Sequence, residues 1–351
     1  MPDTDIGDYN MKIGICGSFG GKKGSLDGQT VKTKIITNEL EHIFSSKNIL
    51  KVDTFGGIKK LFAVLFKLLI FSVNCDHIIV LPAQNSLRLV APFLYYAKKF
   101  FKCKTHYIVI GGWLPDLLLE KKWLCKYVKS FDNIFVETYG MKKKIDDIIS
   151  ADILVMPNCK PLNILKVEEL PQFLDEPFAL CTFSRVMKEK GIEEAVNAVT
   201  TVNNELGRTA YTLDIYGQID LDQVEWFEEL QKNFPEYVKY KGLVAFDKSS
   251  EVLKNYFALL FPTYYEGEGF AGTLIDAMAS GVPVIASDWK YNGEIVSDDI
   301  GFLFNSDEEL KTILCEMLNN INGINELKKN CIKKSQKYTA KNVVYEFVKN
   351  I

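Results

Sequence analysis

Short, continuously apolar runs alternate with helical patterns along this chain of 351 residues, and this alternation restricts the fold more than any other feature. A strand that is apolar along its whole length is buried on both faces, as in a parallel sheet covered by helices on both sides. We expect strands at residues 13–16, 50–54, 77–81, 105–110, 133–137, 153–156, 178–183, 211–216, 238–240 and 257–261. We expect helices at residues 29–44, 58–73, 85–101, 139–149, 191–206, 221–233, 249–256, 308–319 and 322–338. The sequence therefore predicts an α/β fold.

The alternation occurs twice, and four prolines between residues 157 and 177 interrupt it. We expect a disordered extension at 1–10, a first domain at 11–160, a linker at 161–176 and a second domain at 177–339, with a last helix at 340–351 that returns to the first domain. Doubly wound, Rossmann-like domains bind ligands at the carboxyl ends of their strands. Two such domains are expected to face one another across a ligand-binding cleft.

Charge is divided unevenly along the chain. Residues 1–160 hold 23 Lys and Arg against 15 Asp and Glu, net +8, whereas the remainder holds 19 against 30, net −11. The basic first half points to an anionic surface or ligand. Nucleic acid is not expected, because the basic residues are not interleaved with an aromatic recognition pattern and the whole chain has net charge −3. The eight cysteines form no C-x-x-C pair and no zinc pattern with the three histidines, which predicts reduced thiols and no metal site.

The apolar run at residues 58–73 is shorter than the ~20 residues that a membrane span requires, and Lys67 interrupts it. A basic, aromatic-rich helix of this kind lies either in a membrane interface or over one face of a sheet, and both interpretations stay open. The first ten residues are polar and acidic and lack the apolar core of a signal peptide. We therefore expect a cytoplasmic protein, with peripheral contact to the inner membrane face if the interfacial interpretation holds.

The stretch from Phe261 to Asp288 has the composition of a binding site. It comprises a strand, a glycine-rich loop, a short helix, a Gly-Val-Pro turn and another strand, with Glu268 and Asp276 in the middle. A helix N-terminus after glycines offers unpaired N–H groups and the positive end of a dipole, which suit a diphosphate. Carboxylates on either side can accept hydrogen bonds from sugar or ribose hydroxyls, so the stretch predicts a nucleotide-sugar site. Glu266 is an alternative to Glu268 as the functional acid.

The segment from Glu268 to Asp276, Glu-Gly-Phe-Ala-Gly-Thr-Leu-Ile-Asp, resembles the Glu-x7-Glu segment of retaining GT-B glycosyltransferases of family 4 (glycosyl transferases group 1), with Asp276 in place of the second Glu. Further segments resemble the family's motifs in order and spacing. They are Phe183-Ser-Arg-Val-Met-Lys-Glu-Lys-Gly-Ile192, Tyr216-Gly217, Lys241-Gly-Leu-Val244, Asn292-Gly-Glu-Ile-Val296 and Gly301-Phe-Leu-Phe304. The resemblance covers the whole second half of the chain, and Gly20-Gly21 and Pro157-Asn158 are weaker matches in the first.

The resemblance implies a role for each matching residue. Arg185 and Lys190 would bind the donor diphosphate, where two fixed cations can stabilise the departing charge without a metal. Glu268 would contact the donor sugar or the reacting centre, and Asp276 the ribose. The resemblance and the glycine-rich helix start together add further donor-binding positions, namely Gly217, Val244, Gly269, Phe270, Ala271, Gly272 and Thr273.

In the first half, the loop 17–25 directly follows the first strand and is expected to position donor phosphate and acceptor through Gly20, Gly21 and Lys22. It matches neither the Walker pattern nor G-x-G-x-x-G, so a turn with two exposed lysines is the alternative. Relatives in this family carry a sugar-contacting His after a first-domain strand. This chain has Gly111-Gly112 at the comparable place, and none of its three histidines matches.

Together these features predict a retaining hexosyltransferase that needs no metal or cofactor. It would move a sugar from a nucleotide-diphosphate donor, UDP- or GDP-linked, to a saccharide acceptor, expected to be linked to polyprenyl diphosphate in capsule or other surface-glycan synthesis. One alternative is a catalytically degenerate GT-B subunit that binds nucleotide sugar without turnover, motivated by Asp276 and the missing His. The other is a sugar-nucleotide 2-epimerase or a phosphorylase of the same fold. The epimerase would need acid/base residues that this chain mostly lacks, and the phosphorylase a pyridoxal-binding lysine context that is not found.

Overall fold

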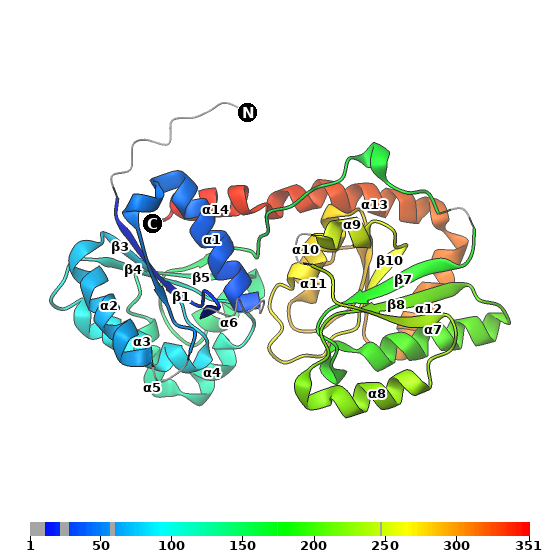
Figure 1. Cartoon of the computed structure of the whole chain (residues 1–351), viewed down its shortest axis with the longest axis horizontal. Coiled ribbons are helices and arrows are strands. Elements are labelled where there is room, and N and C mark those ends of the chain that lie inside the picture. Colours follow the sequence, from blue (N-terminus) through cyan, green and yellow to red (C-terminus); the bar gives the residue numbers. More distant parts are fainter. Residues whose placement is uncertain (1–10, 22–27, 57–59, 174, 246–247) are drawn as a thin grey trace. The chain divides into compact units, whose positions relative to one another are not determined.

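The computed structural model describes residues 11–21, 28–56, 60–173, 175–245 and 248–351. The chain divides into two compact units, Met1–Pro161 with Thr339–Ile351, and Leu162–Tyr338 (Figure 1). Lys22 and the expected extension at 1–10 lie outside the described residues. The segment 162–176 belongs to the second unit, where the Leu165 N–H donates to the carbonyl of Ala279 and Lys328 donates to that of Pro171.

The first unit contains a parallel six-stranded sheet in the order β2-β1-β3-β4-β5-β6. Its strands are β1 (Ile13–Gly17), β2 (Ile49–Asp53), β3 (His77–Leu81), β4 (Lys104–Ile108), β5 (Asn133–Val136) and β6 (Ile153–Val155). Its helices are α1 (Gly28–Phe44), η2 (Ser46–Asn48), α2 (Leu61–Asn74), α3 (Gln84–Ala97), α4 (Leu114–Glu120), α5 (Lys122–Val128), α6 (Tyr139–Asp146) and α14 (Ala340–Val348). Strands β1 and β3 are buried along their whole length, which explains why their residues are apolar apart from His77.

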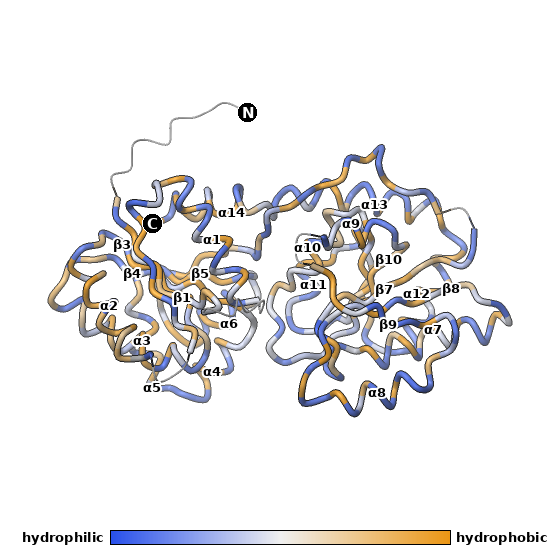
Figure 2. The backbone as a smooth tube through the Cα atoms, viewed as in Figure 1, coloured by the Kyte–Doolittle hydropathy of each residue, from blue (hydrophilic) through white to orange (hydrophobic). Residues whose placement is uncertain are grey.

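Helices cover both faces of this sheet. The last helix, α14, packs against α1, and the ring of Phe347 contacts Phe135 of β5 with centroids 4.6 Å apart. The connections β2 to β3, β3 to β4 and β4 to β5 all run in one direction across the sheet, so the right-handed crossover rule places α2, α3 and α5 on the opposite face (Figure 1). Alternating blue and orange along the helices in Figure 2 marks their mixed polarity, except that α2 is orange over most of its length.

The second unit contains another parallel six-stranded sheet, in the order β12-β11-β10-β7-β8-β9. Its strands are β7 (Phe178–Phe183), β8 (Tyr211–Tyr216), β9 (Val238–Gly242), β10 (Ala258–Phe261), β11 (Val284–Ser287) and β12 (Gly301–Phe304). Its helices are η4 (Val167–Glu169), η5 (Lys188–Lys190), α7 (Ile192–Leu206), η6 (Leu221–Gln223), α8 (Val224–Lys232), α9 (Ser249–Leu253), α10 (Gly272–Ala279), α11 (Asn292–Ile295), α12 (Asp307–Asn319), α13 (Ile321–Ser335) and η8 (Gln336–Tyr338). One apolar cluster fills each side of the sheet.

The two parallel sheets confirm the prediction of an α/β fold built from two Rossmann-like domains. The expected strands and most helices are present within a few residues. The short helices α4 and α5 were not predicted, because each spans only two turns and Pro115 interrupts the pattern. The helix expected at 58–73 is α2, which covers the sheet with Val64, Leu68 and Phe71.

The histidines His77 and His106 lie buried side by side in β3 and β4, with Nδ1 of His77 2.9 Å from Nε2 of His106. Burial, with the neighbouring His77, lowers the pKa of His106 to about 3, and burial also lowers that of His77. The His106 ring therefore stays neutral in the folded state down to about pH 3, whereas an unfolded histidine binds a proton below about pH 6.5. The stability that the neutral His106 contributes is present above about pH 6.5 and is lost as the pH falls towards 3.

We expect the free energy of unfolding to fall by about 1.4 kcal/mol per pH unit below pH 6.5 for His106 alone. Urea unfolding of the wild type and of His106→Gln between pH 7 and pH 5 measures this slope. The variant should have the shallower slope, and His42→Gln, at an exposed position of α1, serves as the matched control. Equal slopes for His106→Gln and the wild type would contradict the prediction.

Candidate nucleotide-sugar site

The site in the second unit is built where β7 and β8 end. Beyond the strands, the Val186 N–H donates to the carbonyl of Gln218 and the Asp220 N–H donates to that of Val186. Gly217 has a φ of +139°, and a Cβ there would lie 1.6 Å from the carbonyl oxygen of Ser184. Only glycine allows these two strand ends to approach so closely.

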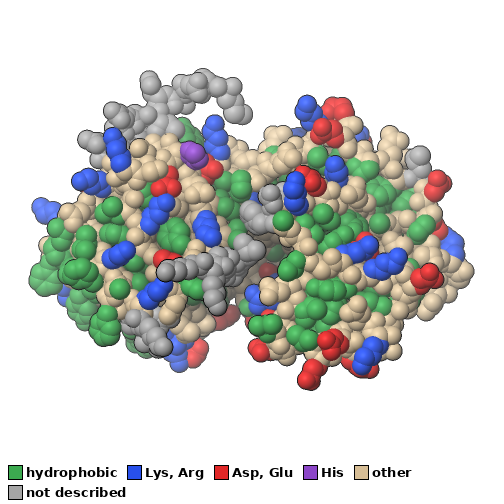
Figure 3. Space-filling model, in the orientation of Figure 1, with side chains coloured by type: hydrophobic (Ala, Val, Ile, Leu, Met, Phe, Trp, Pro, Cys, Tyr) green, Lys and Arg blue, Asp and Glu red, His purple; other side chains and the backbone are tan. Residues whose placement is uncertain are grey.

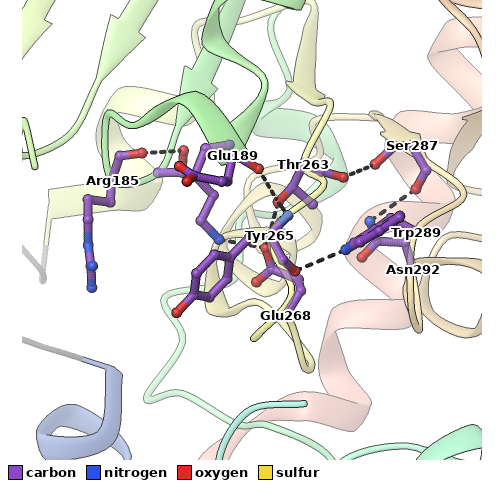
Figure 4. Close-up of polar contacts among 10 residues, drawn as sticks. Arg185, Glu189, Thr263, Tyr265, Glu268, Ser287, Trp289 and Asn292 are labelled. Atoms are coloured by element: carbon purple, nitrogen blue, oxygen red, sulfur yellow. Dashed lines mark hydrogen bonds and ion pairs between the residues drawn. The ribbon is translucent and has the colours of Figure 1, made fainter. Parts of the chain in front are cut away.

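Arg185 and Lys190, which both follow β7, differ in exposure and in their partners. The Arg185 side chain is 54% exposed and forms an ion pair with Asp220 at 3.3 Å. Lys190 is 13% exposed, and its Nζ lies 2.5 Å from Oε2 of Glu268 and 4.8 Å from the centre of the Tyr265 ring. In Figure 4 the Arg185 side chain extends away from the cluster around Glu268. The two cations therefore flank the end of β7 without sharing a partner.

Glu268 is buried, and three polar groups fix its position (Figure 4). Its Oε2 contacts both Lys190 and the hydroxyl of Thr263, the latter at 2.9 Å. Its own N–H donates to the carbonyl of Tyr265. Glu266, the alternative acid, is 74% exposed on its side chain and pairs with Lys290 instead. Of the two acids, Glu268 is therefore the one that is buried and paired with Lys190.

Thr263, which sequence reasoning missed, lies at the centre of the loop that follows β10. Its Oγ1 is also 3.2 Å from the carbonyl of Glu189, which accepts a hydrogen bond from the Tyr264 N–H as well. Its own carbonyl accepts from Ser287 Oγ at the end of β11. Trp289 Nε1 donates to the Tyr265 carbonyl on the same side (Figure 4). The loop that follows β10 is therefore held by η5 on one side and by the end of β11 and the residues after it on the other.

Thr263→Val is expected to lower kcat about tenfold or more, because it removes a hydrogen bond to a buried carboxylate while keeping the side-chain shape. Thr263→Ser should restore most of the rate, which a purely structural role of the methyl group would not explain. The matched control is Thr182→Val in β7, where the buried hydroxyl has no hydrogen-bond partner in the described part of the chain. Steady-state kinetics with varied donor would separate kcat from KM, and equal kcat values for Thr263→Val and Thr182→Val would refute the role.

Helix α10 begins four residues after Glu268. Gly269 and Ala271 precede its first residue, Gly272, and Phe270 is buried against the ring of Tyr338. The Thr273 hydroxyl in the first turn is shielded from solvent and has no hydrogen-bond partner among the described residues. A buried hydroxyl without a partner at a helix N-terminus suits a ligand oxygen.

Asp276 and Val244 complete the expected donor site. Asp276 is buried in α10, and its carbonyl accepts a hydrogen bond from the Ser280 hydroxyl. Val244 follows β9, where the Gly217 N–H donates to the carbonyl of Gly242 and Tyr240 Oη donates to that of Gly217. The segments that follow β7, β8, β9 and β10 therefore carry the predicted donor residues at the carboxyl ends of these strands, except that Asp276 lies in the second turn of α10.

In the first unit, Asp53 at the end of β2 holds the loop expected to position the acceptor. Gly20 and Gly21 both have positive φ, and the N–H groups of Phe19 and Gly21 donate to the Asp53 carboxylate at 2.8 and 3.0 Å. Sequence reasoning missed Asp53, although a polar residue at a strand's carboxyl end is the usual signal.

Gly111 and Gly112 follow β4 and lie beside a buried ion pair. Lys32 of α1 and Glu137, just after β5, pair at 2.5 Å with both side chains at most 3% exposed. The other carboxylate oxygen of Glu137 lies 3.3 Å from the Gly111 nitrogen, which donates to it. Among the residues that the structure describes, no three His, Cys, Asp or Glu side chains gather as a metal site requires.

Comparison with known proteins shows which proteins this chain resembles. Residues 177–320 match the family described as Glycosyl transferases group 1. The GtfA subunit of a UDP-N-acetylglucosamine–peptide N-acetylglucosaminyltransferase from Streptococcus pneumoniae is 34% identical over 126 residues, which are 35% of this chain and 23% of that protein. An uncharacterised glycosyltransferase from Methanocaldococcus jannaschii is 29% identical over 148 residues, 41% of this chain and 36% of that protein. The chain thus matches only a minor part of these curated relatives.

Solved structures extend the similarity to both units. Sucrose-phosphate synthase from Thermosynechococcus elongatus superposes with a TM-score of 0.74 at 14% identity, over 97% of this chain and 98% of that one. HepE from Anabaena, solved with UDP-glucose, gives 0.72 at 15% identity over 97% and 100%. Pneumococcal GtfA, solved with UDP and GlcNAc, gives 0.64 at 19% identity over 82% and 58%. The second unit thus carries a segment similar to the glycosyl transferases of group 1, and the chain has the two-domain fold of the GT-B glycosyltransferases.

Proposed function

We propose that this protein is a glycosyltransferase and that it transfers a sugar, with retention of configuration, from a nucleoside-diphosphate sugar to a saccharide acceptor. The observation that carries the proposal is the buried pair of Lys190 and Glu268 at the carboxyl edge of the second sheet, next to the start of α10. UDP in the solved complexes of HepE and GtfA supports a UDP-linked donor, with GDP as the alternative.

The proposed reaction follows from the charges at this edge. The acceptor hydroxyl attacks the anomeric carbon on the face from which the diphosphate leaves. The bond from that carbon to the diphosphate oxygen breaks, and the acceptor's proton passes to the leaving oxygen. Lys190 and the exposed guanidinium of Arg185 stabilise the diphosphate as its charge grows, while the Thr273 hydroxyl and the N–H groups that start α10 bind its oxygens. Glu268 holds the sugar and Asp276 the ribose.

Because the two cations can supply the positive charge that a metal would supply, we propose that the reaction needs no metal or cofactor. The acceptor is proposed to be a saccharide linked to polyprenyl diphosphate, in the synthesis of capsule or another surface glycan. The protein would then work in the cytoplasm, with peripheral contact to the inner face of the membrane.

The test has two steps. A panel of UDP- and GDP-sugars is screened for thermal stabilisation, and the best donor is then assayed for release of nucleoside diphosphate with a lipid-linked saccharide extract, with and without EDTA. Stabilisation by one donor and acceptor-dependent release that resists EDTA would support the proposal. Stabilisation by no donor would refute it.

A subunit that binds donor but needs a partner for turnover is the second candidate, because the pneumococcal and Streptococcus gordonii relatives are both described as GtfA subunits. Donor binding without turnover by the purified chain, and turnover after addition of a cell extract, would favour it. Turnover by the purified chain alone would exclude it.

A further inference from the structure

Helix α2 presents two apolar stripes, and only one of them faces the sheet. Val64, Leu68 and Phe71 are buried against the first sheet. On the opposite side, Phe62 is 84% exposed, Phe66 64% and Val73 61%, at the spacing of one helix face. A surface helix of a globular domain normally turns charged residues outward, as α8 does with Glu225, Glu228 and Glu229. The outer stripe of α2 therefore needs an explanation.

The exposed apolar surface continues onto the neighbouring helices. Helices α2 and α3 pack together, as do α3 and α5. Tyr96 of α3 and Trp123 of α5 are each half-exposed and both contact the ring of Tyr127, while Phe100, just after α3, is 80% exposed. Figure 3 shows hydrophobic side chains gathered over the edge where α2 lies in Figure 1. We call this surface, formed by Phe62, Phe66, Val73, Tyr96, Phe100 and Trp123, the aromatic face.

Basic residues accompany the aromatic face, and acidic ones are missing from its helices. Residues 61–74, 84–97 and 122–128 contain Lys67, Arg88, Lys122 and Lys126 and no Asp or Glu. The Nζ of Lys126 lies 5.7 Å from the centre of the Tyr127 ring, and that of Lys99 5.3 Å from that of Tyr96. A protein partner of ordinary composition would offer charges of both signs. Exposed Phe and Trp on helices whose charged residues are all basic are instead complementary to an anionic lipid surface, and Glu120, the acid just before α5, is paired with Lys121.

The aromatic face belongs to the same unit as the loop that is expected to hold the acceptor. Phe55, which precedes α2 in the chain, lies at the loop expected to hold the acceptor, since its ring fills the space beside Gly21. No described helix is long and apolar enough to cross a bilayer. We propose that the aromatic face is a docking surface that seats the first unit in the headgroup region of an anionic membrane. This deepens the proposed function, on which it rests for the lipid-linked acceptor.

Co-sedimentation with vesicles tests the proposal. Wild-type protein is expected to bind vesicles of phosphatidylcholine containing phosphatidylglycerol more tightly than vesicles of phosphatidylcholine alone, and to be released by high salt. Phe62→Ser with Phe66→Ser should weaken binding about tenfold or more, because apolar area is lost. Lys99→Gln with Lys126→Gln should have a similar effect through lost charge. Leu221→Ser in the second unit, 82% exposed in the wild type, is the matched control and should bind like the wild type.

Two further readouts separate the outcomes. Thermal stabilisation by the nucleotide sugar should be equal in the wild type and in Phe62→Ser with Phe66→Ser, since neither residue belongs to the proposed donor site. If the wild type is stabilised by donor but does not bind anionic vesicles, the docking surface is refuted and the proposed function stands. If the wild type binds anionic vesicles but no donor stabilises it, the proposed function is refuted and the docking surface stands. A dimer in size-exclusion chromatography that the Phe variant dissociates, without vesicle binding, would assign the aromatic face to a second copy and overturn the proposal.

Discussion

Lys190→Ala is expected to lower kcat by about a hundredfold to a thousandfold, the usual effect of removing one fixed charge that stabilises a transition state. The variant loses the cation proposed to meet the departing diphosphate, and among the described residues it leaves the buried Glu268 with Thr263 as its side-chain partner. Because an uncompensated buried charge is costly, the free energy of unfolding should also fall, by roughly 3 kcal/mol. Donor-saturated release of nucleoside diphosphate measures the first effect and urea unfolding the second.

Lys188→Ala is the matched control, since Lys188 lies in the same short helix η5 and reaches outward over the Trp226 ring. It should retain near-wild-type kcat. Assays well below the melting temperature of Lys190→Ala keep its lower stability from imitating lost catalysis. A Lys190→Ala protein that is folded and turns over at the rate of Lys188→Ala would remove Lys190 from the proposed reaction.

Gly191→Ala is expected to have the second-largest effect, on stability and activity together. Gly191 has a φ of +72°, and a Cβ there would lie 2.0 Å from the carbonyl oxygen of Pro262. The contact joins η5, which carries Lys190, to the loop that carries Thr263. The added methyl must push the two apart, so we expect a loss of several kcal/mol in the free energy of unfolding and more than tenfold in kcat.

The other end of α7 supplies the control for this variant. Gly207 has a φ of +64°, but nothing lies within 4 Å of the position of its Cβ. Gly207→Ala thus carries the left-handed backbone strain of about 1 kcal/mol without the clash. Urea unfolding and kinetics on both variants isolate the effect of the close approach. Equal losses in the two would mean that the contact with Pro262 does not position the site.

The periodic pattern predicted the two sheets because a parallel strand buried on both faces has no polar alternation to obscure it. The pattern did not predict side-chain contacts that depend on how the chain folds. The ion pair of Lys32 with Glu137 joins positions 105 apart in sequence, and neither residue stands out locally. The contact of Thr263 with Glu268 spans only five positions, yet Thr263 reads as an ordinary residue after a strand.

Glu266 and Glu268 show that the local sequence also cannot tell which of two neighbouring acids is buried. Two acids separated by one glycine have the same local chemistry, and only the fold decides that one is buried beside Lys190 while the other faces solvent with Lys290. The helix at 58–73 had two open interpretations, and α2 covers the sheet with one stripe while leaving the other outside. Sequence periodicity could not separate a membrane-interface helix from a sheet-covering helix, because a helix that is apolar all round is compatible with both.

The return of α14 to the first unit has a consequence for biosynthesis. The Ala340 N–H donates to the carbonyl of Lys160, and Phe347 fills the core beside Phe135, so the first unit stays incomplete until α14 is made. The second unit, Leu162–Tyr338, is one continuous segment and needs no later part of the chain to close. The half of the protein that is synthesised first therefore depends on a helix that is made after the whole second unit, and a chain cut before α14 should leave the first unit open to proteases.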